Sequence, residues 1–424
     1  MDKKVGKAFN GLKGEVTIPS DKSISHRAVM LSSLAKGTSV IKNFSSGQDP
    51  KSTFGIFKNL GVDTEYINND LIIKSKGDLS APACKLDCGN SGTTMRLLSG
   101  ILAGQNFDSV LIGDESLSKR PMKRIIEPLN QMGAKIDSDN GFAPLKICGQ
   151  KLNGIDYISA LASAQVKSAI LLAGLFADGK TSFTEPYVSR NHTELMLSYM
   201  ECPVITEGTK TTVQKSVLAP KTISIPGDIS SAAYFIAAGL IVPDSNIILK
   251  NVGLNPTRTG IIDVVRKMGG NVEILDSRTE SNEIVGDLLV QTSELHACEI
   301  SGALIPRLID EIPVIAVLAT QAKGTTIIKD AQDLRNKESD RIQAIVTELK
   351  KLGADITKTD DGMIINGKTD LYGDCEVETY KDHRLAMSLF VAGLMCKNEI
   401  LIKEFDWVKI SFPEFDGLFG TLLT

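Results

Sequence analysis

One unit recurs six times along this chain: an apolar run rich in small residues, a short polar turn and a run of β-branched residues. The copies begin about 65 to 80 residues apart, which is longer than the period of the common solenoid repeats. Their apolar runs begin at Met30, Leu98, Leu171, Phe235, Ile315 and Phe390. Because each run is apolar on nearly all sides, we expect it to form a buried helix with sheet packed around it.

Most copies continue into a second, amphipathic helix that ends in glycine before the next strand. Examples begin at Ile125, Ile261 and Ile345. Glycine closes a helix easily, and β-branched residues then resume the sheet. The repeat therefore predicts two globular α/β domains of three units each. The alternative is a doubly wound sheet, but the chain has neither G-x-G-x-x-G after a strand nor G-x-x-x-x-G-K-[ST].

Composition limits the possible partners and compartment. The 424 residues are too many for one simple core, and the net charge of −4 lacks the basic excess of a nucleic-acid binder. No apolar run is long enough to span a membrane, and the N-terminus lacks the apolar core of a signal peptide. The seven scattered cysteines fit reduced thiols better than disulfides, so we expect a cytoplasmic protein. Cys84 and Cys88 are close, but no second Cys/His pair supports a metal site.

The segment Asp21–Arg27 places a lysine, two serines and an arginine directly before the first apolar run. Backbone N–H groups at a helix start, flanked by cationic side chains, can bind an anion such as phosphate. Taken alone, the segment fits equally well as a helix cap with surface charges.

The same arrangement recurs later in the chain, where each copy alone could also be a helix cap or a solvated turn. Its cations are Lys22, Arg27, Arg96, Arg120, Arg190, Lys337, Arg341 and Arg384. If the repeats bring these helix starts to one cleft, the cleft is strongly positive and suits substrates with several phosphate and carboxylate groups. Asp310 and Glu338 would then be acids among cations, which is a common setting for proton transfer.

Ordered motifs give the chain a specific resemblance to the EPSP synthase family (3-phosphoshikimate 1-carboxyvinyltransferases), and the resemblance covers essentially its whole length. The motifs are DKSISHR at Asp21, GNSGTTMR at Gly89, KRPM at Lys119, SAQVKSA at Ser163, GDISSAAYF at Gly227, NKESDRI at Asn336 and DHRLAM at Asp382. The variants SAQVK, RNHTE at Arg190 and NPTR at Asn255 resemble the bacterial class II branch.

The resemblance implies two inside-out α/β domains, each built from three βαβαββ units around buried helices. One domain would run from 21 to 227, and the other would join 1–20 to 228–424, with the active site in the cleft between them. The family transfers the enolpyruvyl group of phosphoenolpyruvate to the 5-hydroxyl of shikimate 3-phosphate and releases phosphate. This reaction belongs to the shikimate pathway to chorismate and aromatic amino acids. The resemblance implies a cytoplasmic monomer with no cofactor, metal, nucleic-acid partner or membrane.

The family's functional residues can be assigned to positions in this chain. Those expected to bind shikimate 3-phosphate are Lys22, Ser23, Arg27, Ser163, Ala164, Gln165, Arg190, Asp310 and Lys337. Those expected to bind phosphoenolpyruvate are Lys22, Asn90, Gly92, Arg120, Gln165, Arg341 and Arg384. In the implied addition–elimination mechanism, Asp310 accepts the proton of the 5-hydroxyl and Glu338 protonates the methylene carbon. The sequence leaves open which proton each of Lys22, Asp310 and Glu338 moves.

Some positions depart from the family pattern. Lys409 is shifted by one position from the lysine that many members have before the closing Phe-Pro pair, and Asp333 replaces an asparagine. Gly92 is retained where alanine would hinder the inhibitor glyphosate, so the response to glyphosate stays open.

Two other functions are alternatives to this one. The enolpyruvyl transferase that acts on UDP-N-acetylglucosamine carries a reactive cysteine before its Arg-Pro-like segment, whereas residues 113–121 contain none. A non-catalytic anion-binding module would not need two acids among its cations.

Overall fold

The computed structural model describes residues 1–68 and 70–423. The chain folds into two compact units. Unit 1 comprises Met1–Pro19, Pro226–Thr279 and Ile284–Thr424, and unit 2 comprises Ser20–Ile225 with Glu280–Glu283. Each unit has its own hydrophobic core.

Unit 2 contains three four-stranded sheets with the same topology, in the orders β14-β3-β5-β4, β6-β7-β9-β8 and β10-β11-β13-β12. In each sheet, the first two strands are parallel and the remaining pairs are antiparallel. The strands are β3 (Gly37–Lys42), β4 (Asp63–Ile67), β5 (Asp70–Ser75), β6 (Leu86–Asp87), β7 (Ser109–Ile112), β8 (Lys135–Asp139), β9 (Phe142–Cys148), β10 (Asp156–Ile158), β11 (Lys180–Thr184), β12 (Ile205–Glu207), β13 (Lys210–Gln214) and β14 (Thr222–Ser224).

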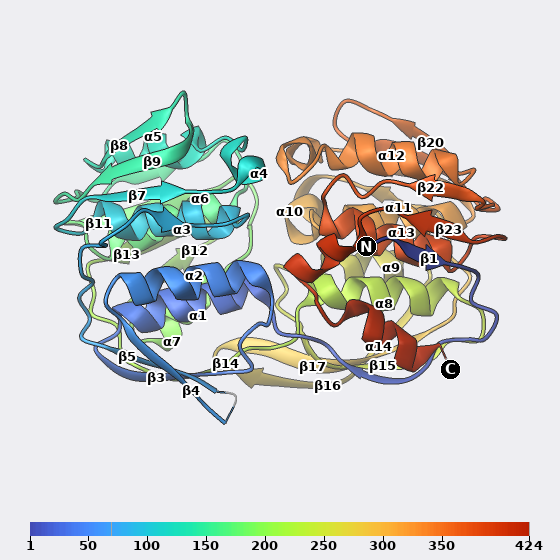
Figure 1. Cartoon of the computed structure of the whole chain (residues 1–424), viewed down its shortest axis with the longest axis horizontal. Helices are drawn as coiled ribbons and strands as arrows, with labels where there is room; N and C mark the ends of the chain where they lie inside the picture. Colours follow the sequence, from blue (N-terminus) through green and yellow to red (C-terminus); the bar gives the residue numbers. More distant parts are fainter. Residues whose placement is uncertain (69, 424) are drawn as a thin grey trace. The chain divides into compact units, whose positions relative to one another are not determined.

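The helices of unit 2 alternate with these strands along the chain (Figure 1). They are α1 (Lys22–Leu34), α2 (Gln48–Asn59), α3 (Gly92–Ala103), α4 (Glu115–Ser118), α5 (Lys123–Gln131), α6 (Ala164–Gly174) and α7 (His192–Tyr199). Helices α1, α3 and α6 are buried over nearly their whole length, as their small, apolar sequences predict. Helices α3 and α6 approach closely, since a Cβ added to Gly100 would lie 2.1 Å from the carbonyl oxygen of Ala169.

Unit 1 repeats this plan with two four-stranded sheets, β16-β17-β15-β2 and β18-β19-β21-β20, and a three-stranded sheet, β1-β23-β22. The strands are β1 (Lys3–Val5), β2 (Lys13–Thr17), β15 (Asn246–Gly253), β16 (Asn271–Glu280), β17 (Glu283–Gln291), β18 (Glu299–Ile300), β19 (Gly324–Ile328), β20 (Asp355–Lys358), β21 (Met363–Gly367), β22 (Cys375–Val377) and β23 (Ile400–Ile402). The N-terminal segment thus completes sheets built mainly from the C-terminal half, because β2 pairs in parallel with β15 and β1 pairs with β23.

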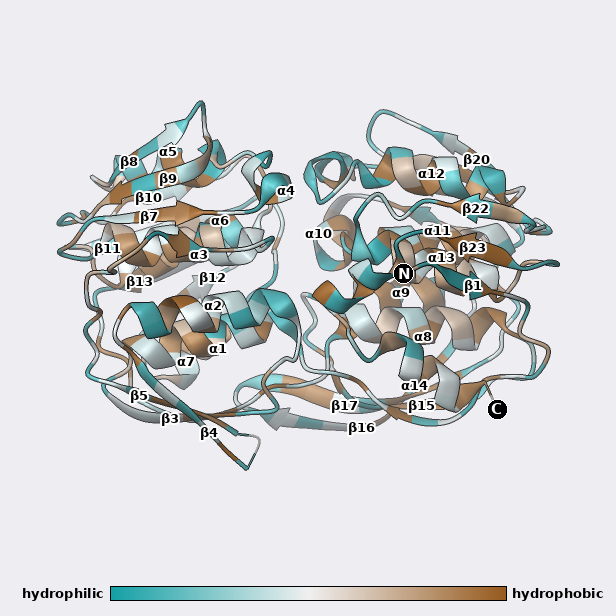
Figure 2. Ribbon diagram, viewed as in Figure 1, coloured by the Kyte–Doolittle hydropathy of each residue, from teal (hydrophilic) through white to brown (hydrophobic). Residues whose placement is uncertain are grey.

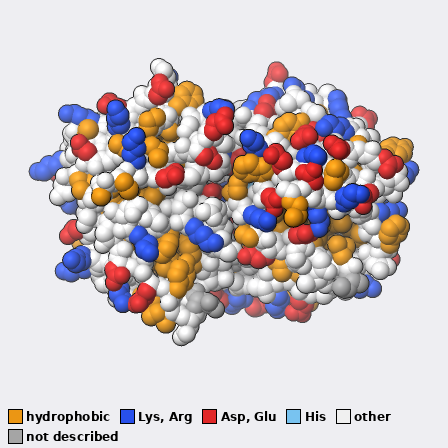
Figure 3. All heavy atoms as spheres, viewed as in Figure 1, with side chains coloured by type: hydrophobic (Ala, Val, Ile, Leu, Met, Phe, Trp, Pro, Cys, Tyr) orange, Lys and Arg blue, Asp and Glu red, His pale blue; other side chains and the backbone are white. Residues whose placement is uncertain are grey.

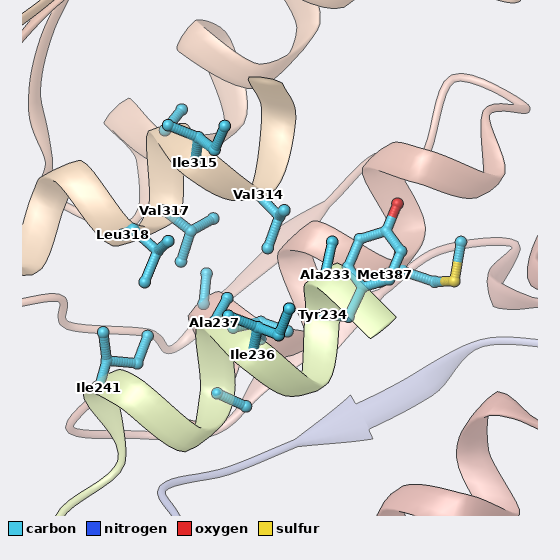
Figure 4. Close-up of a cluster of buried hydrophobic side chains, with 14 of the residues drawn as sticks. Ala233, Tyr234, Ile236, Ala237, Ile241, Val314, Ile315, Val317, Leu318 and Met387 are labelled. Atoms are coloured by element: carbon cyan, nitrogen blue, oxygen red, sulfur yellow. The ribbon is translucent and has the colours of Figure 1, made fainter. Parts of the chain in front are cut away.

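The helices of unit 1 include three that are buried on nearly all sides, α8 (Ile229–Ile241), α11 (Ile312–Gln321) and α13 (His383–Gly393). In Figure 4 the apolar side chains of α8 and α11 point toward one another, with Met387 of α13 close to Tyr234. The other helices are α9 (Gly260–Lys267), α10 (Ile305–Leu308), α12 (Arg341–Lys351), α14 (Phe415–Leu422) and the 3₁₀ turns η1 (Gly302–Leu304), η2 (Gln332–Asn336) and η3 (Phe405–Ile410).

Hydropathy separates the two kinds of helix that the sequence predicts. In Figure 2, α8 carries little of the teal that marks hydrophilic residues, whereas α2 and α12 show much of it. The repeats and the two-unit α/β architecture confirm the predicted fold class. On the face drawn in Figure 3, acidic and basic side chains are interspersed, as the near-balanced composition leads one to expect. Within residues 1–68 and 70–423, no helix is long and apolar enough to cross a membrane.

Candidate active site

The motifs singled out in the sequence lie at helix starts in both units. Helices α1, α3, α6 and α13 are among those capped in the same way, with a side-chain oxygen accepting a hydrogen bond from a backbone N–H of the first turn. The pairs are Asp21 with Ile24, Ser91 with Thr94, Ser163 with Val166 and Asp382 with Arg384. The caps leave the cationic side chains of these turns available to form clusters with other polar groups.

Lys22 and Arg27 occupy the first two turns of α1. The ammonium of Lys22 lies 3.1 Å from Asp49 Oδ2 on α2. Arg27 is buried, and its Nε donates to Thr193 Oγ1 at 2.7 Å. Its two terminal nitrogens donate to Ser168 Oγ at 2.8 Å and to the carbonyl oxygen of Ser23 at 2.9 Å. Contacts to α6 and α7 therefore fix the orientation of the Arg27 guanidinium.

His26 lies between these two cations and begins a buried polar chain. Its Nδ1 and Thr94 Oγ1 both lie 2.7 Å from Thr53 Oγ1, and Thr94 Oγ1 donates to Ser91 Oγ at 2.8 Å. Burial holds the pKa of His26 well below its usual value, and the charges of Lys22 and Arg27 lower it further. A neutral histidine thus connects the start of α1 to the cap of α3.

Two more arginines converge at the start of α3. Arg96 Nη1 donates to Gln165 Oε1 at 2.6 Å, and Arg120 Nη2 donates to Asn90 Oδ1 at 3.2 Å. Gly92 lies between them, since a Cβ there would come within 2.9 Å of Arg96 Nη1 and 3.2 Å of Arg120 Nη1. The absence of a side chain at this position therefore lets both guanidiniums sit where they do.

The remaining predicted residues of unit 2 lie around the start of α6 and before α7. Ser163 caps α6, and Ala164 and Gln165 form its first turn. Gln165 Nε2 donates to Thr93 Oγ1 at 3.0 Å, so this side chain bridges α6 and α3. Arg190 is half-buried in the loop between β11 and α7.

In unit 1, three carboxylates surround Arg341, which is only 1% exposed. Its Nε lies 2.8 Å from Asp382 Oδ2, its Nη1 lies 3.2 Å from Asp310 Oδ1 and its Nη2 lies 2.6 Å from Glu338 Oε2. Burial alone would lower the pKa of Arg341, but Asp382, Glu338 and Asp310 raise it above its usual value. The two acids predicted to transfer protons therefore contact one permanently charged guanidinium.

Lys337 joins this group, with its Nζ 3.3 Å from Asp310 Oδ1 and 4.0 Å from Asp333 Oδ2. Lys409, which departs from the family pattern, is exposed on η3 and forms an ion pair with Asp406 at 2.5 Å. Its ammonium therefore takes part in a surface ion pair.

Arg384, in the first turn of α13, is also buried. Its Nη1 lies 3.5 Å from the carbonyl oxygen of Ser230 and 3.9 Å from Glu311 Oε1. Burial alone would lower its pKa, but nearby groups, including Tyr234, Asp310 and Glu311, hold it well above its usual value. Burial also raises the pKa of Tyr234 to about 12.

Several residues in these clusters have no role assigned from the sequence. Asp382 lies inside the motif DHRLAM, where its position close to Arg384 was the available signal, whereas Glu311 follows Asp310 and its contact with Arg384 joins distant parts of the sequence. Arg258 is buried and donates to Ser230 Oγ at 2.7 Å, which in turn donates to Glu311. Asp49 has no motif of its own, so its pairing with Lys22 could not be read from the sequence.

The predicted residues thus form two groups, one in each unit. Unit 2 holds Lys22, Ser23, Arg27, Asn90, Gly92, Arg120, Ser163, Ala164, Gln165 and Arg190, and unit 1 holds Asp310, Lys337, Glu338, Arg341 and Arg384. Hydrogen bonds join Asn90 with Arg120, and Asp310 with Lys337 and Arg341. Among the described residues, no group of three or more His, Cys, Asp or Glu side chains is placed to hold a metal ion.

Known proteins resemble the chain over nearly its whole length. A protein of Thermoanaerobacter sp. (strain X514) named 3-phosphoshikimate 1-carboxyvinyltransferase is 55% identical over 414 residues, covering 97% of this chain and 98% of that protein. A protein of the same name from Bacillus subtilis (strain 168) is 53% identical over 411 residues, covering 95% and 96%.

Solved structures agree with these sequence matches. EPSP synthase from Acinetobacter baumannii superposes with a TM-score of 0.88 at 41% identity, covering 100% of this chain and 98% of that one. The enolpyruvyl transferase NikO from Streptomyces tendae has a TM-score of 0.80 at 16% identity, covering 99% and 96%, and so shares the fold. The family profile described as EPSP synthase (3-phosphoshikimate 1-carboxyvinyltransferase) matches residues 7–418, and the chain belongs to this family.

Proposed function

We propose that this chain transfers the carboxyvinyl group of phosphoenolpyruvate to the 5-hydroxyl of shikimate 3-phosphate, giving 5-enolpyruvylshikimate 3-phosphate and phosphate. In a chain of this family, the observation that carries the proposal is the contact of Asp310 and Glu338 with the buried Arg341. A binding module has no need for two such acids around one guanidinium. The reaction places the enzyme in the shikimate pathway to chorismate and aromatic amino acids.

The proposed reaction is an addition followed by an elimination. Asp310 takes the proton of the 5-hydroxyl, Glu338 protonates the methylene carbon of phosphoenolpyruvate, and the hydroxyl oxygen bonds to C2. In the elimination, Glu338, now a carboxylate, takes back a proton from the new methyl group, the C–H electrons form the new C=C bond, and the C–O bond to phosphate breaks with its electrons leaving on phosphate. Arg341 holds both acids in one orientation, which supports these roles, because proton transfer requires defined geometry. Lys337 beside Asp310 would meet the ring hydroxyls.

The cations of unit 2 suit the phosphate and carboxylate groups of the two substrates. We assign shikimate 3-phosphate to the starts of α1 and α6 and to the loop before α7. The residues proposed there are Lys22, Ser23, Arg27, Ser163, Ala164, Gln165 and Arg190. The fixed guanidinium of Arg27 supports this assignment.

Phosphoenolpyruvate is assigned to the start of α3 and its neighbours, with further contacts from unit 1. The residues proposed are Lys22, Asn90, Gly92, Arg120, Gln165, Arg341 and Arg384. The convergence of Arg96 and Arg120 on Gly92 supports a doubly charged ligand there. Lys22 is the third proposed catalytic residue because it serves both substrates.

We further propose that both units serve this one reaction, and that the enzyme is a cytoplasmic monomer acting on small molecules. Residues 21–227 would form one domain, and 1–20 with 228–424 the other, with the active site in the cleft between them. Size-exclusion chromatography with light scattering would measure the oligomeric state, and a mass of about 46 kDa is expected for a chain of 45.7 kDa.

The test of the function is phosphate release by the purified protein with phosphoenolpyruvate and shikimate 3-phosphate. A parallel reaction contains UDP-N-acetylglucosamine instead of shikimate 3-phosphate. Release with shikimate 3-phosphate alone is expected. Release with the nucleotide sugar alone would assign the chain to a different acceptor, and release with neither would contradict the proposal.

A further inference from the structure

Lys167 is a buried lysine of α6 to which the proposed mechanism assigns no role. Its Nζ lies 2.7 Å from Glu185 Oε1, 2.7 Å from Glu194 Oε1 and 3.2 Å from the carbonyl oxygen of Ser189. The side chains of Lys167 and Glu185 are each 2% exposed, and that of Glu194 is 7% exposed. A buried group with two carboxylates and one ammonium is costly to form unless its geometry is well defined, so its presence calls for an explanation.

The cluster of Lys167, Glu185 and Glu194 joins three segments that carry proposed substrate contacts. Lys167 lies one turn after Ser163, at the start of α6. Glu185 and the carbonyl of Ser189 belong to the loop that carries Arg190, and Glu185 also accepts a hydrogen bond from the backbone N–H of Ser189 at 2.9 Å. The cluster thus holds Ser189, the residue before Arg190, by both its backbone N–H and its backbone carbonyl.

The third segment is α7, on which Glu194 follows Thr193. Thr193 Oγ1 accepts the hydrogen bond from Arg27 Nε and lies 2.7 Å from Ser168 Oγ. Ser168 is the neighbour of Lys167 on α6 and also accepts from Arg27. The ammonium of Lys167 therefore holds both α7, which contacts Arg27 through Thr193, and the loop that carries Arg190.

Packing alone does not hold this region together. A cavity of about 310 Å³ borders the cluster, and Val188, Asn191 and Val204 are among the residues that line it. Within the described residues, Glu185 Oε2 and Glu194 Oε2 also have no hydrogen-bond partner. Side chains beside a cavity can shift, so the ion pairs of Lys167 and the hydrogen bonds of Thr193 to Arg27 and Ser168 together restrain the 185–194 segment.

We propose that Lys167, through Glu185 and Glu194, is a positioning residue for the binding of shikimate 3-phosphate. It holds the loop that carries Arg190 and the helix that carries Thr193 in a fixed position against the start of α6. The proposal rests on the function proposed above. It predicts a specific effect on one substrate, because Arg27 and Arg190, which lie on the segments held by the cluster, are assigned to shikimate 3-phosphate alone.

The test compares Lys167→Met with Lys167→Arg and with Leu172→Ala. Leu172 is buried on the same helix, so its replacement lowers stability without touching the cluster. Lys167→Met should raise the KM for shikimate 3-phosphate about tenfold or more, with the KM for phosphoenolpyruvate and kcat within about threefold of wild type. Lys167→Arg, which keeps the charge and has the adjoining cavity for its extra volume, should restore most of the affinity.

Thermal unfolding is measured for every variant, and calorimetric titration with shikimate 3-phosphate gives an affinity that is independent of turnover. An equal rise of this KM in Leu172→Ala at an equal loss of stability would overturn the proposal, as would an unchanged KM in Lys167→Met. If Lys167→Met does not fold, Glu194→Gln takes its place, since it retains the Lys167–Glu185 pair. It should still raise the KM about threefold, and an unchanged KM would overturn the proposal.

The wild-type protein in the same assay separates the two hypotheses. A wild type without phosphate release contradicts the proposed function. A wild type with normal release, beside Lys167 variants with unchanged substrate affinity, contradicts only the positioning role.

Discussion

Arg341 is the buried cation of unit 1 that three carboxylates share. It contacts Asp310, Glu338 and Asp382 while being 1% exposed. We expect Arg341→Met to lower the free energy of unfolding by about 3–5 kcal/mol, because it leaves carboxylates without their counter-charge in a buried setting. Urea unfolding measures this change.

The control for Arg341→Met is Lys397→Met, which removes an exposed ion pair with Asp370. That variant should change the free energy of unfolding by about 1 kcal/mol or less. Equal losses of unfolding free energy in the two variants would show that the three contacts of Arg341 stabilise the protein no more than one exposed ion pair does.

Glu338 provides a second prediction at this scale, because its proposed role is chemical. Glu338→Gln retains the size and the hydrogen-bonding capacity of the side chain but removes the acid. We expect kcat to fall about 10²- to 10⁴-fold while calorimetry shows near-normal binding of shikimate 3-phosphate. Asp333→Asn is the matched control, since it neutralises a nearby carboxylate 4.0 Å from Lys337 and should leave kcat nearly unchanged. Normal turnover of Glu338→Gln would remove Glu338 from the chemistry.

Gly92 tests the geometry of the cations at the start of α3. A Cβ at this position would meet Arg96 Nη1 at 2.9 Å and Arg120 Nη1 at 3.2 Å, so Gly92→Ala must displace guanidinium groups. We expect the KM for phosphoenolpyruvate to rise about tenfold and that for shikimate 3-phosphate to change little. Gly55→Ala on α2 is the control, because the added methyl group meets nothing within 4 Å. Similar kinetics for the two variants would argue against a phosphoenolpyruvate site at Gly92.

At the scale of the elements, the close contact between α3 and α6 depends on one glycine. A Cβ at Gly100 would lie 2.1 Å from the carbonyl oxygen of Ala169, a backbone atom that cannot move alone. Gly100→Ala should therefore lower the free energy of unfolding by about 1–3 kcal/mol or more. Gly55→Ala, an unobstructed helical glycine in the same unit, should raise it by about 0.5–1 kcal/mol. Denaturant unfolding of both variants measures whether the free energy of unfolding falls in Gly100→Ala and rises in Gly55→Ala.

The elements were also the part of the structure that the sequence predicted best. Apolar runs such as that beginning at Phe235 are buried helices, because a helix without a polar face has no stable position at a surface. The cations at helix starts were recognisable because each lies within a local motif. Their partners were not, because the contacts of Lys22 with Asp49 and of Arg341 with Asp382 join residues 27 and 41 positions apart. Such pairings depend on how the repeats pack, which no local pattern specifies.

At the scale of the whole molecule, we expect His26 to contribute to the change of the free energy of unfolding with pH. Its folded-state pKa lies well below its usual value of about 6.5, first because of burial and then because of Lys22 and Arg27. Between these two pKa values the unfolded chain binds a proton that the folded chain does not bind. The free energy of unfolding should therefore rise with pH up to about 6.5, and the contribution of His26 is lost as the pH falls below that value.

His26→Gln measures this contribution, because glutamine keeps polar atoms near Thr53 but does not titrate. Urea unfolding between pH 5 and pH 7.5 should give a smaller slope with pH for this variant than for the wild type, even if its stability at pH 7.5 is lower. His296→Gln is the matched variant, since it replaces an exposed histidine by the same residue. A wild-type slope retained in His26→Gln would mean that other groups cause the acid sensitivity. A reduced slope would show that the neutral histidine between Lys22 and Arg27 links the protonation of one residue to the stability of the molecule.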